Sequence, residues 1–225
     1  MTAPPSPPAA VVFDCDGLLL ETERCWTRAE EELFRRYGRA FGANEKRALI
    51  GTSLFDGSYI LERLLEQPGR AGALGQELLD LVERRLFEEA TAMPGAVDLV
   101  LGLMGRAPVA VASNTPERLV RGALACAGVA ELFDVVVTAD QVAEPKPSPD
   151  VYLRACELLG VSPSASIALE DSPTGVAAAR AAGMFVLGIP SFPGVVLDGA
   201  DLVAGSLADD SVRRALGLCC SNTSV

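Results

Sequence analysis

The stretch VVFDCDGLLLETE, Val11 to Glu23, places two aspartates directly after an apolar run. Asp14 and Asp16 are separated only by Cys15 and are followed by Gly17. The apolar residues before them are typical of a strand that is buried on both faces of a sheet. Two carboxylates so close together raise each other's pKa unless a cation or a substrate intervenes. The pair therefore costs stability, which indicates a functional site.

Short apolar runs typical of β-strands recur along the chain. They span residues 9–14, 108–114, 133–140, 165–171, 184–190 and 200–205. Helical patterns that begin at a Thr-Pro or Ser-Pro pair and end at a glycine lie between several of these runs. They span residues 115–128, 148–160 and 172–183. This alternation predicts an α/β fold with a doubly wound, Rossmann-like parallel sheet.

One segment departs from the alternation. Between Leu18 and Ala92 the sequence shows helical stretches and no convincing strand. At about seventy residues it is too long for a connecting loop and small for an independent domain. Because open α/β sheets bind ligands at the carboxyl ends of their strands, we interpret it as a cap over that edge. We expect a core domain of residues 1–17 and 93–225, with 1–8 as a mobile tail, and an α-helical cap domain of 18–92.

Composition excludes several classes of mechanism. The 225 residues include no histidine, so Ser-His-Asp, Cys-His and phosphohistidine chemistry are excluded. Acid-base work must then fall to carboxylates, lysine, tyrosine or cysteine. The net charge of -11 argues against a nucleic-acid partner, because phosphate-backbone binding relies on clusters of Lys and Arg.

The sequence also carries expectations about location and partners. The start MTAPPSPPAA has no basic region followed by a long apolar run, and no window approaches the roughly 20 apolar residues of a membrane span. We expect a cytoplasmic protein with no membrane partner, monomeric, with a dimer as the alternative. The cysteines have no C-x-x-C pairing, so we expect free thiols. They stand at positions 15, 25, 126, 156, 219 and 220.

Further polar residues stand where later predicted strands end. Ser113 and Asn114 close one strand, Lys146 follows the next, and Glu170 and Asp171 close a third. Singly, each has a structural explanation: a helix cap, a solvated loop lysine, or an acidic pair at a helix start. Taken as an ordered set at successive strand ends, they favour a functional site at one edge of the sheet.

Phosphoryl transfer is the chemistry that joins these residues. Asp14 can act as the nucleophile that forms an aspartyl-phosphate, and Asp16 can protonate the leaving oxygen and later deprotonate water. A Mg²⁺ ion held by Asp14, Asp171 and the backbone carbonyl of Asp16 makes the crowded carboxylates tolerable. Ser113 and Lys146 can bind the phosphoryl oxygens by hydrogen bond and by charge.

Four segments resemble, in order, the four motifs of the haloacid dehalogenase superfamily: DCDGLLLETE, VASN, KPSPDVYL and ALEDSPTGVAAARAAGM. The resemblance covers the chain from Val11 to about Ser206, and the insert resembles the α-helical type 1 cap of subfamily I. It implies catalytic roles for Asp14 and Asp16, phosphate binding by Ser113, Asn114 and Lys146, and Mg²⁺ binding by Asp14, Asp16, Glu170 and Asp171.

The branch of the superfamily follows from fewer residues. Asp16 argues against dehalogenation at carbon. The β-phosphoglucomutase branch has a His and an Arg where this sequence has Trp26 and Leu54. The stretch DGLLLETE and MPGA at 93–96 resemble phosphatases that act on pseudouridine 5'-phosphate and on small sugar phosphates. The resemblance thus implies a Mg²⁺-dependent phosphatase of a small phosphorylated substrate; the alternatives are an intramolecular phosphotransferase and a catalytically silent binding protein.

Substrate choice should lie in the cap. Four residues there are candidates to face the leaving group: Thr22, Glu23, Trp26 and Ser53. Trp26, the single tryptophan, can stack on a planar base, or it can pack between cap helices.

Overall fold

The computed structural model describes residues 3–49, 52–192 and 194–218. The chain divides into two compact units, one made of residues 1–21 and 91–225 and the other of residues 22–90. The first unit is an α/β core, and the second is entirely helical over its described residues.

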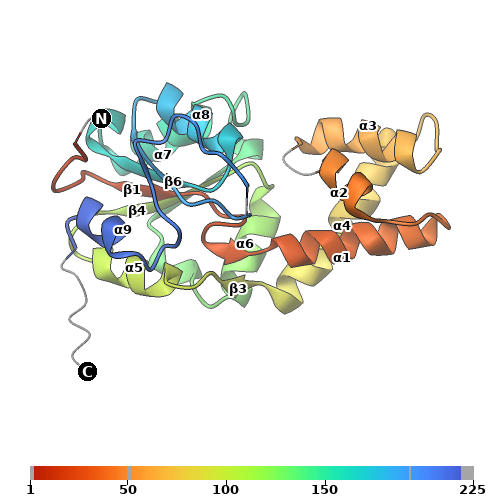
Figure 1. Ribbon diagram of the computed structural model, residues 1–225, viewed down its shortest axis with the longest axis horizontal. Helices are drawn as coiled ribbons and strands as arrows, with labels where there is room; N and C mark the ends of the chain where they lie inside the picture. Colours follow the sequence, from red (N-terminus) through yellow and green to blue (C-terminus); the bar gives the residue numbers. More distant parts are fainter. Residues whose placement is uncertain (1–2, 50–51, 193, 219–225) are drawn as a thin grey trace. The chain divides into compact units, whose positions relative to one another are not determined.

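A six-stranded, wholly parallel sheet forms the centre of the first unit (Figure 1). Val11 lies opposite Val109 on one neighbouring strand and Ile167 on the other. Each strand falls within one of the six apolar runs, which confirms the predicted doubly wound fold. In spatial order the strands are β5 (Val135–Thr138), β4 (Val109–Ser113), β1 (Val11–Phe13), β6 (Ile167–Glu170), β7 (Phe185–Gly188) and β8 (Leu202–Val203).

Helices cover both faces of this sheet. On one face, Val12, Ala110 and Val137 form a buried cluster with side chains of α7 (Asp150–Leu159) and α8 (Pro173–Ala181). Figure 1 shows α5 (Ala96–Leu103) and α9 (Asp210–Ala215) on the opposite side of the sheet, and α6 (Glu117–Cys126) connects β4 to β5. Burial of each such Val or Leu side chain contributes roughly 1.5–3 kcal/mol. Because helices cover both faces of the sheet, the side chains on both sides of each strand are apolar, which explains the continuous apolar runs in the sequence.

The start of α8 and the end of α7 match the predicted capping pattern, whereas α6 and α7 have the prolines Pro116 and Pro149 as their N-caps. Ser172 is the N-cap of α8: its hydroxyl oxygen accepts the N–H of Gly175 at 3.0 Å, and Pro173 follows in the first helical position. Gly160 ends α7 with a left-handed φ of 69°. These two caps fix where α8 begins after β6 and where α7 ends before β6.

The order of the strands creates a ligand-binding edge. From β1 the chain proceeds to β4 and β5 on one side and then returns through α7 to β6 on the other side of β1. At such a reversal the connections leave on opposite faces, and a crevice opens at the carboxyl ends of the strands. Asp14 follows β1 and Glu170 ends β6, so both lie at this crevice.

A two-stranded antiparallel ladder lies where the chain leaves and re-enters the core. It pairs β2 (Leu20–Glu21) with β3 (Thr91–Ala92), and the N–H of Met93 donates to the carbonyl of Leu19 at 2.8 Å. The expectation of no strand between Leu18 and Ala92 is therefore wrong. Strands of two residues are too short for an alternating pattern to be detected.

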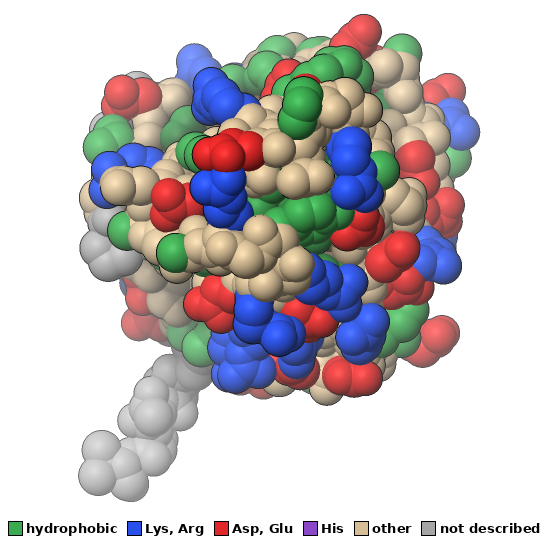
Figure 2. All heavy atoms as spheres, turned by 90° about the vertical axis from the view of Figure 1, so that its right-hand side faces the viewer, with side chains coloured by type: hydrophobic (Ala, Val, Ile, Leu, Met, Phe, Trp, Pro, Cys, Tyr) green, Lys and Arg blue, Asp and Glu red, His purple; other side chains and the backbone are tan. Residues whose placement is uncertain are grey.

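The helical unit is held together by an apolar stripe. Cys25, Ala29 and Leu33 on α1 are buried, as are Leu74, Leu78 and Leu81 on α4, and the spacing of three or four residues puts each set on one helix face. Figure 2 shows basic and acidic side chains side by side on one face of the molecule. The helices are α1 (Glu23–Arg36), α2 (Ala43–Leu49), α3 (Leu54–Leu64) and α4 (Ala71–Glu89).

The ends of the chain and its cysteines can be compared with the sequence-based expectations. Residues 3–8 form no helix or strand, Pro8 is buried, and the N–H of Ala9 donates to the carbonyl of Ala165 at 2.8 Å. Over the described ranges, no helix is long and apolar enough to cross a membrane. Cys219, Cys220 and the segment around them lie outside the described residues. Among the described cysteines, Cys15, Cys25, Cys126 and Cys156 form no disulfide bond.

Candidate active site

The carboxyl ends of β1, β4 and β6 bring the predicted polar residues together. Asp14 comes directly after β1, and its N–H donates to the carbonyl of Leu169 on β6 at 3.0 Å. Ser113 is the last residue of β4, and Glu170 is the last residue of β6. Because all strands of the sheet point the same way, three segments distant in the sequence meet at one edge.

Lys146 is the centre of a buried charge cluster at this edge. The residue is 6% exposed. Its Nζ donates to Asp14 Oδ1 at 2.6 Å, to Glu170 Oε1 at 2.6 Å and to the carbonyl of Ala112 at 2.8 Å. Three acceptors match the three N–H bonds of an ammonium group. Lys146 is therefore not a solvated loop lysine.

Asn114 fixes the segment that carries Lys146. The Asn114 side-chain amide donates from Nδ2 to the carbonyl of Lys146 at 3.1 Å, and its Oδ1 accepts the N–H of Lys146 at 2.8 Å. The side chain thus pairs with the backbone of Lys146 as another peptide group would. This geometry makes Asn114 a support for Lys146, in addition to the phosphate-binding role predicted for it.

Ser113 joins the side chain of Asp16 to the end of β4. The Ser113 hydroxyl donates to Asp16 Oδ2 at 3.2 Å, and its oxygen accepts the N–H of Thr115 at 3.0 Å. Ser113 is 1% exposed. It is not the N-cap of α6, a position that Pro116 occupies. The Ser113 hydroxyl therefore belongs to the candidate site, where it contacts Asp16.

Three carboxylates at this edge are arranged to hold a cation. Asp14, Glu170 and Asp171 each offer one oxygen, and these oxygens lie within 4.8 Å of one another. All three residues are buried. Carboxylate oxygens are the ligands that Mg²⁺ prefers, usually two of them together with water and substrate phosphate. The donor set therefore fits a divalent metal ion.

The two oxygens of Glu170 are already occupied by hydrogen bonds. Oε1 accepts from Lys146 Nζ and from the hydroxyl of Tyr152, each at 2.6 Å. Oε2 accepts from the N–H of Asp171 at 3.1 Å and from the hydroxyl of Ser172 at 3.2 Å. Glu170 is fully buried. It is therefore better placed to anchor Lys146 than to coordinate a metal ion directly, and Asp14 and Asp171 offer the more available oxygens.

A glycine lets the chain pass close to the metal-binding carboxylates. Gly17 has a φ of +84°, which side-chain-bearing residues rarely adopt, and a Cβ on it would lie 2.5 Å from Asp171 Oδ2. The same Cβ would lie 3.3 Å from the Cβ of Ser191, in the loop after β7. The DCDG motif therefore needs its glycine to leave room for Asp171.

The cluster is electrostatically strained as long as no cation is bound. Burial raises the pKa of Asp14 well above its usual value; Lys146 opposes this shift, and the neighbouring carboxylates add to it. Burial and the charge of Glu170 raise the pKa of Asp171 to about 7. Burial lowers the pKa of Lys146, but Asp14 and Glu170 raise it more, so its net shift is upward. One ammonium does not balance the carboxylates around it, and a divalent cation relieves the excess.

Two residues of the site were not predicted. Tyr152 is fully buried on α7 and donates to Glu170. The Ser191 side chain forms a hydrogen bond with Asp171, which partly opposes the rise in the pKa of that carboxyl. A tyrosine at an apolar helix position and a serine in a loop are common without any site, so the sequence carried no signal for either.

The four residues expected to face the leaving group lie in the helical unit. Thr22 is buried, and Glu23 forms an ion pair with Lys46 at 2.6 Å. Ser53 is the N-cap of α3, where its hydroxyl oxygen accepts a backbone N–H of the first turn at 3.0 Å. Trp26 is half-buried. Ser53 therefore has a structural role of its own, while Trp26 is only partly buried.

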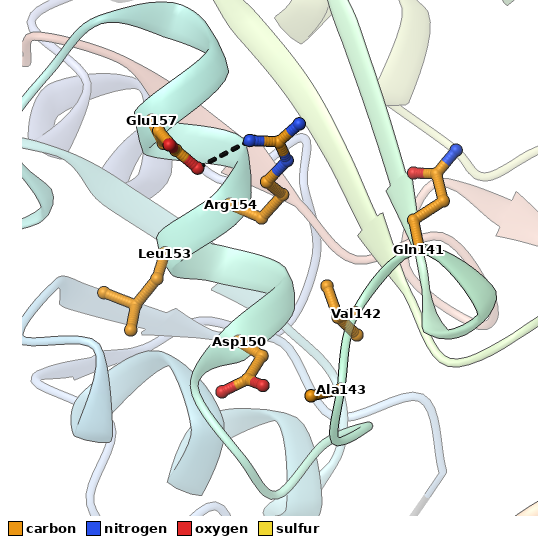
Figure 3. A pocket seen from close by; sticks show the side chains of 7 residues that line it. All are labelled: Gln141, Val142, Ala143, Asp150, Leu153, Arg154 and Glu157. Atoms are coloured by element: carbon orange, nitrogen blue, oxygen red, sulfur yellow. Dashed lines mark hydrogen bonds and ion pairs between the residues drawn. The ribbon is translucent and has the colours of Figure 1, made fainter.

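A pocket of about 430 Å³ beside α7 holds none of the predicted residues (Figure 3). Leu153 and Val142 line it, together with an ion pair between Arg154 and Glu157 at 2.7 Å. Its arginine is thus already paired with a carboxylate. The buried cluster around Lys146 is therefore the stronger candidate for chemistry.

Comparison with known proteins identifies the family. Residues 8–183 match the model of the haloacid dehalogenase-like hydrolases. The chain belongs to this family. The motif-based expectation, a phosphatase of the haloacid dehalogenase superfamily, is confirmed at this level.

Relatives of this hydrolase include proteins with phosphatase names. It is 33% identical over 176 residues to the fructose-1-phosphate phosphatase YqaB of Escherichia coli K12, an alignment that covers 78% of this chain and 93% of the relative. Among solved structures, CbbY from Rhodobacter sphaeroides in complex with phosphate is 30% identical, with a TM-score of 0.78, and covers 90% of this chain and 96% of that one. A putative β-phosphoglucomutase from Thermotoga maritima is 28% identical, with a TM-score of 0.75, covering 92% and 96%.

Proposed function

We propose that this hydrolase is a Mg²⁺-dependent phosphatase of small phosphate monoesters that acts through a phosphorylated Asp14. The observation that carries the proposal is the contact of 2.6 Å between Lys146 Nζ and Asp14 Oδ1 inside the carboxylate cluster. It places the candidate nucleophile, Asp14, beside a cation that can bind the oxygens of the phosphoryl group. Similarity to a fructose-1-phosphate phosphatase supports sugar phosphates as the first substrates to test; nucleotides and pseudouridine 5'-phosphate come next.

The proposed reaction assigns one step to each aspartate. An oxygen of Asp14 attacks phosphorus and forms an acyl phosphate as the bond to the leaving oxygen breaks, and Asp16 gives that oxygen its proton. Asp16 then takes a proton from water, which attacks phosphorus and releases inorganic phosphate and free Asp14. Ser113 and Lys146 bind the phosphoryl oxygens. Asp14, Asp171 and the carbonyl of Asp16 would hold Mg²⁺, which when bound would supply charge stabilisation and orientation.

The helical unit is proposed as the cap domain of the enzyme. In this proposal the cap is residues 22–90, slightly shorter than the 18–92 expected from the sequence, and the core is residues 1–21 and 91–225. The exposed part of Trp26 is proposed to contact the leaving group. Closure of a cap excludes bulk water and completes the contacts to substrate. The cytoplasmic location and the monomeric state stay predictions.

A phosphomutase is the second candidate, because the fold is similar to a putative β-phosphoglucomutase. Such an enzyme shares the first step but passes the phosphoryl group to a sugar hydroxyl. Trp26 and Leu54 stand where the mutase motifs have His and Arg, which favours water as the acceptor. Release of inorganic phosphate, rather than a rearranged sugar phosphate, distinguishes the two reactions.

The test is phosphate release from fructose 1-phosphate, glucose phosphates, pseudouridine 5'-phosphate and nucleoside monophosphates, in Mg²⁺ and in EDTA. Wild type is compared with Asp14→Asn and with Asp98→Asn, which changes an exposed aspartate on α5. We expect Mg²⁺-dependent release that falls by on the order of 10³ or more in Asp14→Asn and stays unchanged in Asp98→Asn.

The outcomes separate the alternatives. Retention of the phosphoryl group on an isomerised sugar indicates the mutase. Release that persists in Asp14→Asn, or in EDTA, shows that the proposed nucleophile or the proposed metal dependence is wrong.

A further inference from the structure

Tyr152 contacts the buried charge cluster through its hydroxyl group. It lies near the start of α7, is fully buried, and its hydroxyl donates to Glu170 Oε1 at 2.6 Å. That distance lies in the range of O–H bonds to ionised carboxylates. Burial and the charge of Glu170 raise the pKa of Tyr152, so the phenol keeps its proton and remains a donor. The contact is therefore a charge-assisted bond between a phenol and a carboxylate.

The carboxylate oxygen that Tyr152 contacts is the one that holds Lys146. Lys146 Nζ also lies 2.6 Å from Glu170 Oε1, and it lies 5.0 Å from the centre of the Tyr152 ring. Tyr152 thus touches both partners of this ion pair, through its hydroxyl on one side and its ring face on the other. A cation over an aromatic face at this distance is attracted by the ring quadrupole.

We propose that Tyr152 is a positioning residue that sets how the charge of Lys146 is divided between Glu170 and Asp14, an inference that rests on the proposed function. Lys146 Nζ and the Tyr152 hydroxyl both donate to Glu170 Oε1, so this oxygen binds each donor less strongly than it would bind one donor alone. The phenol therefore limits the hold of Glu170 on the ammonium group. It leaves more of the positive charge for Asp14 Oδ1 and for the phosphoryl group that Lys146 binds.

Removal of the hydroxyl reverses this balance. In Tyr152→Phe the ring and its packing remain, but Oε1 has only Lys146 as a donor at this side. The ammonium group then moves toward Glu170 and away from Asp14. Binding of phosphate should weaken, because Lys146 is the cation proposed to bind the phosphate oxygens.

The experiment compares Tyr152→Phe with Tyr37→Phe. Tyr37 is a matched control, because its hydroxyl donates to Glu77 Oε1 at 2.9 Å within the helical unit. At saturating Mg²⁺ we measure inhibition by inorganic phosphate, kcat and KM separately, and the melting temperature. For Tyr152→Phe we expect the inhibition constant of phosphate and the KM to rise roughly tenfold, with a smaller change in kcat. Tyr37→Phe should change neither the inhibition constant of phosphate nor the KM.

A second variant covers the case in which Tyr152→Phe does not fold. Site-specific 3-fluorotyrosine at position 152 keeps the size of the side chain and makes the phenol a stronger donor. It should lower the inhibition constant of phosphate, the opposite direction to the Phe variant. A lower melting temperature with both constants unchanged in Tyr152→Phe, or no effect of the fluorinated residue, overturns the proposal and leaves Tyr152 as a core residue.

Crystal structures of wild type and Tyr152→Phe make the test independent of turnover. We expect the Lys146 Nζ to lie further from Asp14 Oδ1 in the variant, and an unchanged contact overturns the proposal. If wild type releases no phosphate from any substrate, the proposed function fails. The displacement of Lys146 still decides the role of Tyr152.

Discussion

Lys146 and Asp14 lie 132 positions apart in the sequence, yet Lys146 Nζ and Asp14 Oδ1 are 2.6 Å apart in the buried site. The lysine side chain is 4% exposed, and that of Asp14 is 11% exposed. A pair so far from water is held by its full set of partners, because each charge is costly to bury alone. The nucleophile and the phosphate-binding cation of the proposed reaction therefore also depend on each other for stability.

Lys146→Met should destabilise the protein and abolish phosphate release. Without the ammonium group, Asp14 and Glu170 are left as buried carboxylates with no counter-charge, a change that costs about 3–5 kcal/mol. Urea unfolding in EDTA measures this loss, and Arg154→Met is the control, because the Arg154 side chain is 45% exposed. A free energy of unfolding equal to that of Arg154→Met would show that the pair contributes little.

Gly17→Ala should weaken metal binding more than it weakens the fold. The new Cβ would lie 2.5 Å from Asp171 Oδ2, so the carboxylate has to move. Gly38→Ala is a matched control: Gly38 has a φ of +67°, and nothing lies within 4 Å of its added Cβ. Both variants carry the backbone cost of a positive φ, about 1 kcal/mol, but only Gly17→Ala crowds the site.

Titration calorimetry with Mg²⁺ separates the two glycine variants. We expect the dissociation constant for Mg²⁺ to rise roughly tenfold or more in Gly17→Ala, because a displaced carboxylate ligand loses its geometry. Gly38→Ala should bind as wild type does. Equal affinities in the two variants would mean that Asp171 is not a metal ligand.

The sequence predicted the fold and most of the site because each depends on local patterns. Apolar runs that end in Asp14, Ser113 or Glu170 mark the carboxyl edge of a parallel sheet without any knowledge of distances. The role of Asn114 was not predictable in the same way, because it depends on a pairing with the backbone of Lys146, 32 positions away. Tyr152 has the appearance of an ordinary core residue, and only the position of Glu170 beside it gives its hydroxyl a role.

Asp171 should make the metal-free protein less stable as the pH rises. Its pKa is about 7 in the folded protein and about 3.9 in the unfolded chain, so the folded state binds more protons between these values. The stability that this proton gives is fully present below pH 4 and is lost as the pH rises through 7. Asp171→Asn does not titrate and should escape this loss.

Urea unfolding of wild type and Asp171→Asn at pH 5, 6, 7 and 8 in EDTA checks the sign. The variant should gain about 1.4 kcal/mol of stability relative to wild type for each pH unit between pH 5 and the folded-state pKa of about 7, and little more above it. Mg²⁺ should restore wild type at pH 8 and have less effect on the variant. Parallel curves in EDTA would show that Asp171 titrates as an ordinary surface carboxyl.

Lys46→Met should destabilise the helical unit. The side chain of Glu30 is 6% exposed, and its Oε2 accepts from Lys46 Nζ at 2.8 Å, while Lys46 also pairs with Glu23 at 2.6 Å. Burial raises the pKa of Glu30, and the charge of Lys46 opposes that shift. Without Lys46, Glu30 is buried with no counter-charge. Because Lys46 is itself 21% exposed, we expect a loss of about 2 kcal/mol rather than the larger cost of a fully buried pair.

Tryptophan fluorescence measures this loss selectively, because Trp26 on α1 is the single tryptophan of the chain. The cycle of Lys46→Met, Glu30→Gln and the double variant gives the coupling energy between the two side chains. The double variant should recover most of the stability that Lys46→Met loses, because it removes the stranded charge together with its partner. If Lys46→Met leaves the urea midpoint of the fluorescence transition unchanged, the pair does not stabilise the helical unit, and Glu30 takes up a proton or reaches water instead.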